Sequence, residues 1–203
     1  MLTCYFKLSN LLFMKKGILT VTILMSLFVC FTASAQSDSA AMKKWMESMM
    51  PGEMQSNLAS NEGEWSTETT LWLNPSAPPV TSKGACVNKM ILGGRYLESR
   101  HTGTVMNMPF EGIGTYGFDN VKKVFVVSWI DNMGTGIMHM EGTWDDATQS
   151  VTFRGTQADP FTGATVDMME VHKIIDSNNQ LMEMFVVQNS HEIKTMQVKY
   201  VRK

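Results

Sequence analysis

The sequence is poor in cysteine, which excludes a disulfide-stabilised scaffold. It contains three cysteines among 203 residues, and two of them, Cys4 and Cys30, lie within the first 35 residues. Cys86 is left alone, so no intrachain disulfide can form even in an oxidising compartment. No basic residue adjoins Cys86 to activate its thiol, and we expect a small buried side chain. Val29 does not suit the small residue required before a lipidated cysteine, which disfavours a lipid anchor at Cys30.

Basic charge is also scarce. The chain carries 17 basic against 19 acidic side chains, and its first 35 residues contain three of the lysines and no acid. The remaining 168 residues therefore have a formal charge of −5. Nucleic acids and anionic membranes require a basic surface, so we predict neither as a partner.

Motifs of known catalytic and metal centres are missing. The four histidines show no H-x-H or H-x-x-H spacing, which disfavours a zinc site. The chain has no G-x-S-x-G, P-loop or G-x-G-x-x-G sequence. We therefore assign no catalytic residue, no metal and no cofactor from the sequence.

Long apolar runs are confined to the N-terminus. Two lysines precede an apolar run over residues 18–31, and Ala33-Ser34-Ala35 has the small residues of a cleavage site. The run is shorter than the roughly 20 apolar residues of a membrane-spanning helix. We predict a signal peptide over residues 1–35, with translation starting at Met14 and cleavage after Ala35. The mature protein is then periplasmic or secreted, without stable membrane insertion.

Two short amphipathic helices are predicted within residues 36–62. Apolar side chains recur at helical spacing from Met42 to Met50, with charged residues on the opposite face. Pro51 interrupts this helix and suits the first turn of a second one, in which Met54 and Leu58 lie one turn apart.

After Gly63 the pattern changes to alternation rich in β-branched and aromatic residues. Turn-forming residues, such as Gly93-Gly94 and Asp119-Asn120, divide this part into short segments. The segments predict ten strands, over residues 65–73, 81–92, 95–105, 110–118, 122–131, 136–145, 150–157, 165–175, 180–189 and 192–202. So many strands without a helical crossover must hide their edges. Short hairpins then favour a mainly β fold, a closed antiparallel up-and-down barrel over residues 63–203 with the helices over one end.

Alternation also assigns the barrel interior. In residues 136–145 the charged side chains occupy odd positions, so the even positions are expected to point inward. The same reasoning places Met182, Met184 and Val186 inside. In the last strand it puts Lys194 on one side with Met196, Val198, Tyr200 and Arg202.

Gly63, Trp65 and Arg202 are expected to close one end of the barrel. First and last strands are neighbours in a closed barrel, so the Arg202 guanidinium can lie over the indole of an inward-pointing Trp65. Glycine at position 63 permits a backbone conformation that a Cβ would resist. A G-x-W at the start of the first strand, with a basic residue near the end of the last, resembles the lipocalin and fatty-acid-binding (calycin) superfamily.

A closer resemblance extends over nearly all of the chain after the signal peptide. Its segments are residues 63–65, 91–98, 109–112, 116–120, 128–131 and 200–203. Together they resemble the bacterial DUF1579 family, which is regarded as lipocalin-like and has no established activity. The resemblance implies the barrel and supplies no substrate, cofactor or catalytic residue.

Methionine is unusually common, with 19 in the chain. Met-x-Met pairs place both thioethers on one face of a strand, where they form a deformable apolar wall or, alternatively, a soft Cu(I) site. We favour the apolar wall, because His139 points away from Met138 and Met140. Asp131 joins the predicted pocket because it follows an aromatic-rich strand, at a loop expected to border a barrel mouth. The predicted pocket residues are Met138, Met140, Trp144, Met182, Met184, Met196, Tyr200 and Asp131.

These patterns favour an exported barrel that binds a small apolar or amphipathic molecule, with few polar groups to orient it. A non-catalytic structural or interaction barrel is the second hypothesis, and Cu(I) binding is the last. An enzyme, such as a hydrolase or isomerase, stands between them and would need carboxylates at the barrel mouth with perturbed pKa values. The carboxylates considered for this role are Glu98, Glu111, Asp119, Asp131 and Glu170.

Overall fold

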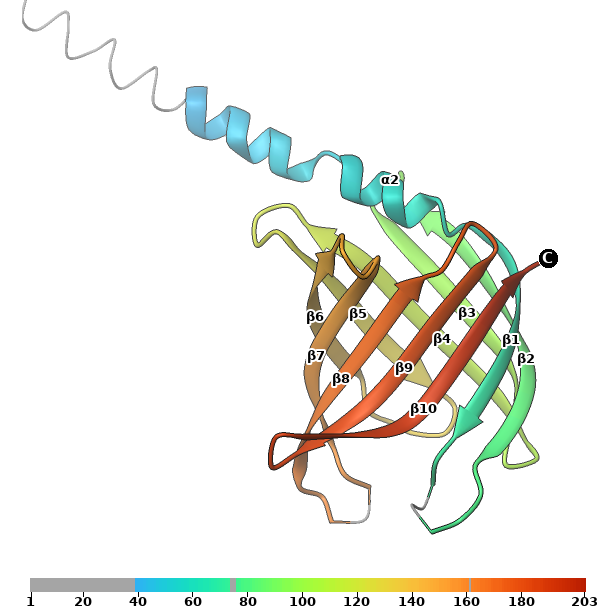
Figure 1. The fold of residues 1–203 in the computed structure, drawn as a ribbon. Helices are drawn as coiled ribbons and strands as arrows, with labels where there is room; N and C mark the ends of the chain where they lie inside the picture. The colour runs from blue at the N-terminus through green and yellow to red at the C-terminus, as the bar shows by residue number, and fades with distance from the viewer. Residues whose placement is uncertain (1–38, 74–75, 161) are drawn as a thin grey trace, which may run out of the picture. The chain divides into compact units, whose positions relative to one another are not determined.

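The computed structural model describes residues 39–73, 76–160 and 162–203 (Figure 1). The chain divides into two compact units, residues 1–49 and 50–203. In the first unit, residues 39–49 form the predicted amphipathic helix, whereas the predicted signal peptide lies outside the described residues. Within the ranges described, no helix is long and apolar enough to cross a membrane.

The second unit is a closed barrel of ten antiparallel strands, as the sequence predicts. Each strand pairs with its neighbours in sequence, and β1 closes the barrel against β10 (Figure 1). The predicted strand limits agree with the observed ones to within two residues, because turn-forming residues bound each segment. The strands are β1 Gly63–Leu71, β2 Val80–Ile91, β3 Tyr96–Val105, β4 Met108–Asp119, β5 Val124–Asp131, β6 Met138–Asp145, β7 Ser150–Ala158, β8 Thr165–Ile174, β9 Asn179–Gln188 and β10 His191–Arg202.

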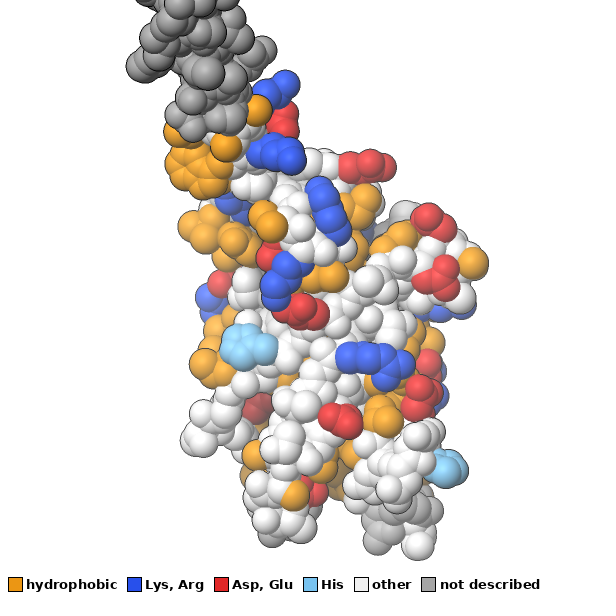
Figure 2. Space-filling model, turned by 90° about the vertical axis from the view of Figure 1, so that its left-hand side faces the viewer, with side chains coloured by type: hydrophobic (Ala, Val, Ile, Leu, Met, Phe, Trp, Pro, Cys, Tyr) orange, Lys and Arg blue, Asp and Glu red, His pale blue; other side chains and the backbone are white. Residues whose placement is uncertain are grey.

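The strands bury alternate side chains in the barrel interior, which confirms the predicted faces of β6 and β9. Met140 is 2% exposed and packs with Met182 and Met184, while Met138 and Met196 are partly buried against the same core. Acidic and basic side chains are interspersed on the outer face shown in Figure 2. On β6 and β9 the methionines therefore face the interior and the charged side chains face outward.

The prediction for Lys194 is wrong. A register shift in the β10–β9 pairing between Lys194 and Met196 breaks the alternation. Lys194 consequently pairs with Phe185 on the outer face, where its ammonium contacts Glu183 and lies 5.8 Å from the centre of the Trp72 ring. The inward series on β10 starts at Met196.

Trp65 and Arg202 meet at the barrel end. They are register partners on β1 and β10, Trp65 is fully buried, and the guanidinium carbon lies 4.2 Å from the centre of the indole. The guanidinium also donates hydrogen bonds to three backbone carbonyls, those of Ser60, Glu62 and Ser177. Gly63 has a φ of +127°, and a Cβ there would lie 3.0 Å from an Arg202 nitrogen. The expected contact is therefore present, and only glycine fits beside it.

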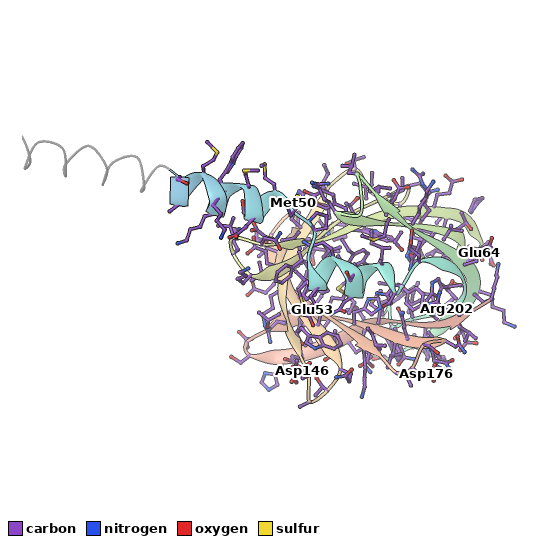
Figure 3. The ribbon with its side chains drawn as sticks, turned by 90° about the horizontal axis from the view of Figure 1, so that it is seen from above. Met50, Glu53, Glu64, Asp146, Asp176 and Arg202 are labelled. Atoms are coloured by element: carbon purple, nitrogen blue, oxygen red, sulfur yellow. The ribbon has the colours of Figure 1, made fainter. Side chains whose placement is uncertain are left out.

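Helix α2, Glu53–Ala59, covers part of the same barrel end (Figure 3). It is the second of the predicted helices, and it buries Leu58 in the barrel core. The Gln55 side-chain oxygen accepts a hydrogen bond from the Gly52 N–H, and its amide donates to the carbonyl of Phe118 at the end of β4. Because α2 contacts β2, β3 and β4, it leaves the β6–β9 side of this end less covered.

Candidate functional site

A cavity of about 340 Å³ occupies the α2 end of the barrel. Its walls combine apolar side chains with polar groups that come from separate strands. The apolar residues are Leu58, Leu97, Phe125, Trp144, Val151, Phe153 and Ile174. The volume lies within the range of about 300–1,000 Å³ that is typical of small-molecule sites.

The cavity opens beside α2, opposite the strands that the helix contacts. Asn57 and Ser60 of the α2 segment line it and are exposed, as are Asp146 and Gln149 of the β6–β7 turn. Viewed from above, the turns that carry Asp146 and Asp176 lie on one side of the helix (Figure 3). Access thus runs between α2 and the β6–β7 turn.

Asn61, just after α2, connects the helix to the polar groups of the cavity. Its backbone carbonyl accepts hydrogen bonds from Trp65 Nε1 at 3.1 Å and from Asn88 Nδ2 at 3.0 Å. Asn88 Oδ1 accepts from the Cys86 thiol, and Cys86 also lies 3.2 Å from Ser99 Oγ. One chain of polar contacts therefore runs from the barrel end down into the interior.

A second chain leads from Asn61 to His172. The Gln180 side-chain amide donates to Asn61 Oδ1 at 2.5 Å, which leaves the Gln180 carbonyl oxygen facing His172 Nε2 at 3.0 Å. A carbonyl oxygen only accepts, so His172 Nε2 carries the proton and donates. In the neutral ring, Nδ1 is then an acceptor.

Aromatic rings cluster around His172. Its ring stacks on Tyr200 at a centroid distance of 5.8 Å and meets Tyr116 edge-on at 6.4 Å, while Tyr116 contacts Phe153 at 6.3 Å. All four residues line the cavity. Burial raises the pKa values of both tyrosines well above their usual range, so their hydroxyls stay protonated hydrogen-bonding groups.

Glu170 lies beside this cluster inside the barrel. It is 3% exposed, and its register partners are Phe153 on β7 and Met184 on β9. Its Oε1 atom has no hydrogen-bond partner within the part of the chain that the structure describes. Burial raises the pKa of the carboxyl from 4.5 to about 7.

Burial disfavours the charged forms of the other titratable groups that the structure describes in the interior. Burial lowers the pKa of His101 from 6.5 to about 4, and His172 contributes further. Burial also lowers the pKa of His172, and the hydrogen bond that His172 donates to Gln180 opposes this effect. The pKa of Cys86 rises to about 11, so its thiol stays protonated. Glu170 is thus a described interior group whose pKa lies near neutral pH.

The predicted pocket residues fall into three groups. Trp144 and Tyr200 line the cavity. Met138, Met140, Met182, Met184 and Met196 fill the core and are not part of the cavity wall. Asp131 ends β5 at the barrel end that lies away from α2, and it accepts a hydrogen bond from Trp129 Nε1 at 2.7 Å. Ser99, His172 and Gln180 also line the cavity, and the sequence patterns did not assign them to the pocket.

The five carboxylates considered for catalysis do not converge. Glu98 pairs with Arg100 at 2.7 Å on an exposed face, and Asp119 accepts hydrogen bonds from backbone amides of the β4–β5 turn. Glu111 and Asp131 lie near each other at the barrel end opposite α2. Asp131 pairs with Gly112, and the Glu111 N–H donates a hydrogen bond to Asn132 Oδ1. Glu170 alone is buried inside. Over the described ranges, no three His, Cys, Asp or Glu side chains are grouped to hold a metal ion.

The fold and the cavity define a closed antiparallel β-barrel with a small interior chamber at one end. A family model described as a protein of unknown function (DUF1579) matches residues 50–202. The chain therefore belongs to the DUF1579 family, as the sequence resemblance indicated. No curated protein is significantly similar to it in sequence.

Proposed function

We propose that this protein is an exported binding protein that holds a small amphipathic molecule in the cavity at the α2 end. The cavity carries the proposal: a chamber of about 340 Å³ combines apolar walls with hydrogen-bonding groups from Ser99, Tyr116, His172 and Tyr200. Such a combination is typical of small-molecule sites, in which the apolar surface supplies affinity and a few polar groups fix the orientation.

Binding is tested by saturable fluorescence enhancement of a neutral probe, 1-aminoanthracene. Val151 lines the cavity and is 9% exposed, so Val151→Phe should fill part of the chamber and weaken probe binding at least tenfold. Thr152→Phe is the matched control, since it adds the same ring to the opposite face of the same strand. A purely structural barrel would show no saturable binding, or equal binding by wild type and Val151→Phe.

Export is tested separately on the full chain. Its support is the predicted signal peptide, with basic residues at 15–16, an apolar run and the Ala33-Ser34-Ala35 site. After expression in a Gram-negative host, intact mass spectrometry should find a product that begins at Gln36 in the periplasm or medium. A product that retains residues 14–35 and stays in the cytoplasm would contradict this part of the proposal.

A further inference from the structure

The cavity has a carboxyl group beside its inner end and no cationic side chain among the described residues of its walls. Glu170 points into the interior with 3% of its surface exposed, and Oε1 has no hydrogen-bond partner among the described residues. None of the described residues that line the cavity is a lysine or an arginine. Arg202, at the barrel end, is engaged by three carbonyls and the indole of Trp65.

This arrangement disfavours an anionic ligand. A carboxylate or phosphate that entered the cavity would pass Asp146 at the mouth and approach Glu170, with no positive side chain in the wall to compensate its desolvation. The fatty-acid type of amphipathic ligand is therefore a poor match to the charges of this chamber.

Aromatic rings beside Glu170 favour the opposite charge. Tyr116, Tyr200 and Phe153 line the inner part of the cavity, and Tyr116 and Tyr200 are close enough to Glu170 for electrostatic interaction. The faces of aromatic rings attract cations, most strongly where water is excluded. A buried carboxylate in a low-dielectric interior adds a larger attraction at similar distances.

We propose, resting on the binding function above, that the ligand is a small organic cation, a protonated amine with an apolar body. Its ammonium group lies among Tyr116, His172 and Tyr200, with Glu170 as its counter-ion. The body fills the space between Leu97, Phe125 and Val151.

The affinity for such a cation should depend on pH through Glu170. The titratable groups that face Glu170 are Tyr116 on β4 and Tyr200 on β10, with His172 two residues further along β8. Phe153 and Met184, opposite it on β7 and β9, carry no charge. Burial favours the neutral forms of the tyrosines and of His172, while the Glu170 carboxyl, with a pKa of about 7, ionises between pH 6 and pH 8. Affinity for an amine should therefore rise about tenfold between pH 6 and pH 8.

The test uses three ligands that share one apolar body: 2-(1-naphthyl)ethylamine, 2-(1-naphthyl)ethanol and 1-naphthylacetate. Isothermal titration calorimetry at pH 8 should give the tightest binding for the amine, by at least tenfold over the alcohol, and the weakest for the acid. Glu170→Gln should abolish the preference for the amine over the alcohol. Asp167→Asn, which removes an exposed acid from the outer face of the same strand, should behave as wild type.

The outcomes separate this inference from the binding function. If the alcohol binds and the amine binds no more tightly, the cation inference fails while the binding function stands. The same conclusion follows if the acid binds more tightly than the amine. Retention of the amine preference by Glu170→Gln would also overturn the role of Glu170. If none of the three ligands binds, the binding function itself fails. Should Glu170→Gln not fold, the tenfold pH dependence in the wild-type protein decides the matter.

Discussion

Replacing Glu170 by glutamine should change how the stability of the barrel depends on pH. The folded carboxyl has a pKa of about 7, against 4.5 for an unperturbed carboxyl. Below pH 4.5 the carboxyl is protonated in both states, and Glu170 costs the folded state no ionisation. As the pH rises from 4.5 to 7, the unfolded chain has released its proton while the folded one still holds it. Stability is therefore lost progressively over this interval.

The size of the loss follows from the two pKa values. Each pH unit between them is worth about 1.4 kcal/mol, so the full interval amounts to about 3 kcal/mol. Glutamine has a similar shape and does not titrate. Relative to wild type, Glu170→Gln should thus gain about 3 kcal/mol of unfolding free energy between pH 4 and pH 8.

Urea unfolding followed by tryptophan fluorescence measures this difference. Subtracting the wild-type from the Glu170→Gln unfolding free energy at each pH cancels the contributions of His101 and His172, which both proteins share. It also removes any constant cost of burying the amide. A difference that stays within about 1 kcal/mol from pH 4 to pH 8 would show that the carboxyl ionises normally in the folded state. Burial would then not raise the pKa of Glu170.

Three further changes test the packing and electrostatics of the barrel. Gly142→Ala should destabilise the protein by about 2 kcal/mol in urea unfolding, because a Cβ would lie 2.5 Å from a backbone oxygen of β7. Gly136→Ala is the control and should be neutral, since a Cβ there would meet nothing within 4 Å. Equal effects of the two changes would contradict this prediction. Arg202→Lys should lower the melting temperature through a loss of about 2 kcal/mol, since lysine cannot reproduce the planar fork to three carbonyls; an unchanged melting temperature would exclude a structural role. Between pH 6.5 and 4 the unfolded chain binds a proton at His101 that the folded protein does not, so the wild-type protein loses stability as the pH falls. The unfolding free energy of His101→Gln should therefore fall less than that of wild type over this interval. Parallel stability profiles of the two proteins would argue against a buried neutral ring.

Strand limits and faces were predictable because they depend on local sequence. Turn residues bound each segment, and alternation of apolar and charged side chains fixed which face of β6 is buried. The same alternation could have revealed the polar interior, since Cys86 and Asn88, like Glu170 and His172, stand two residues apart on one strand face. The Met-x-Met pairs indicate core positions instead.

Other features depend on contacts that no local pattern encodes. The register shift before Met196 reverses the face of Lys194, and nothing in the alternating sequence of β10 indicates it. The position of Asn61 between Asn88 and Gln180 results from how the segment after α2 meets two distant strands, β2 and β9. The volume of the cavity likewise follows from side-chain packing across the barrel, so the sequence predicted a chamber without its location or its polar wall.

Closure of the barrel between its first and last strands has a consequence for how the chain folds. Trp65 pairs with Arg202, and the Arg202 guanidinium bonds to carbonyls about 140 residues away. Strands β1 to β9 can pair successively through short hairpins, but the edge of β1 stays open until β10 is available. Closing so long a loop is entropically slow and comes late in folding. During that interval the open strand edges are available for pairing with another copy of the chain. Residues that stabilise the β1–β10 pairing therefore also shorten the time during which these edges are exposed to aggregation.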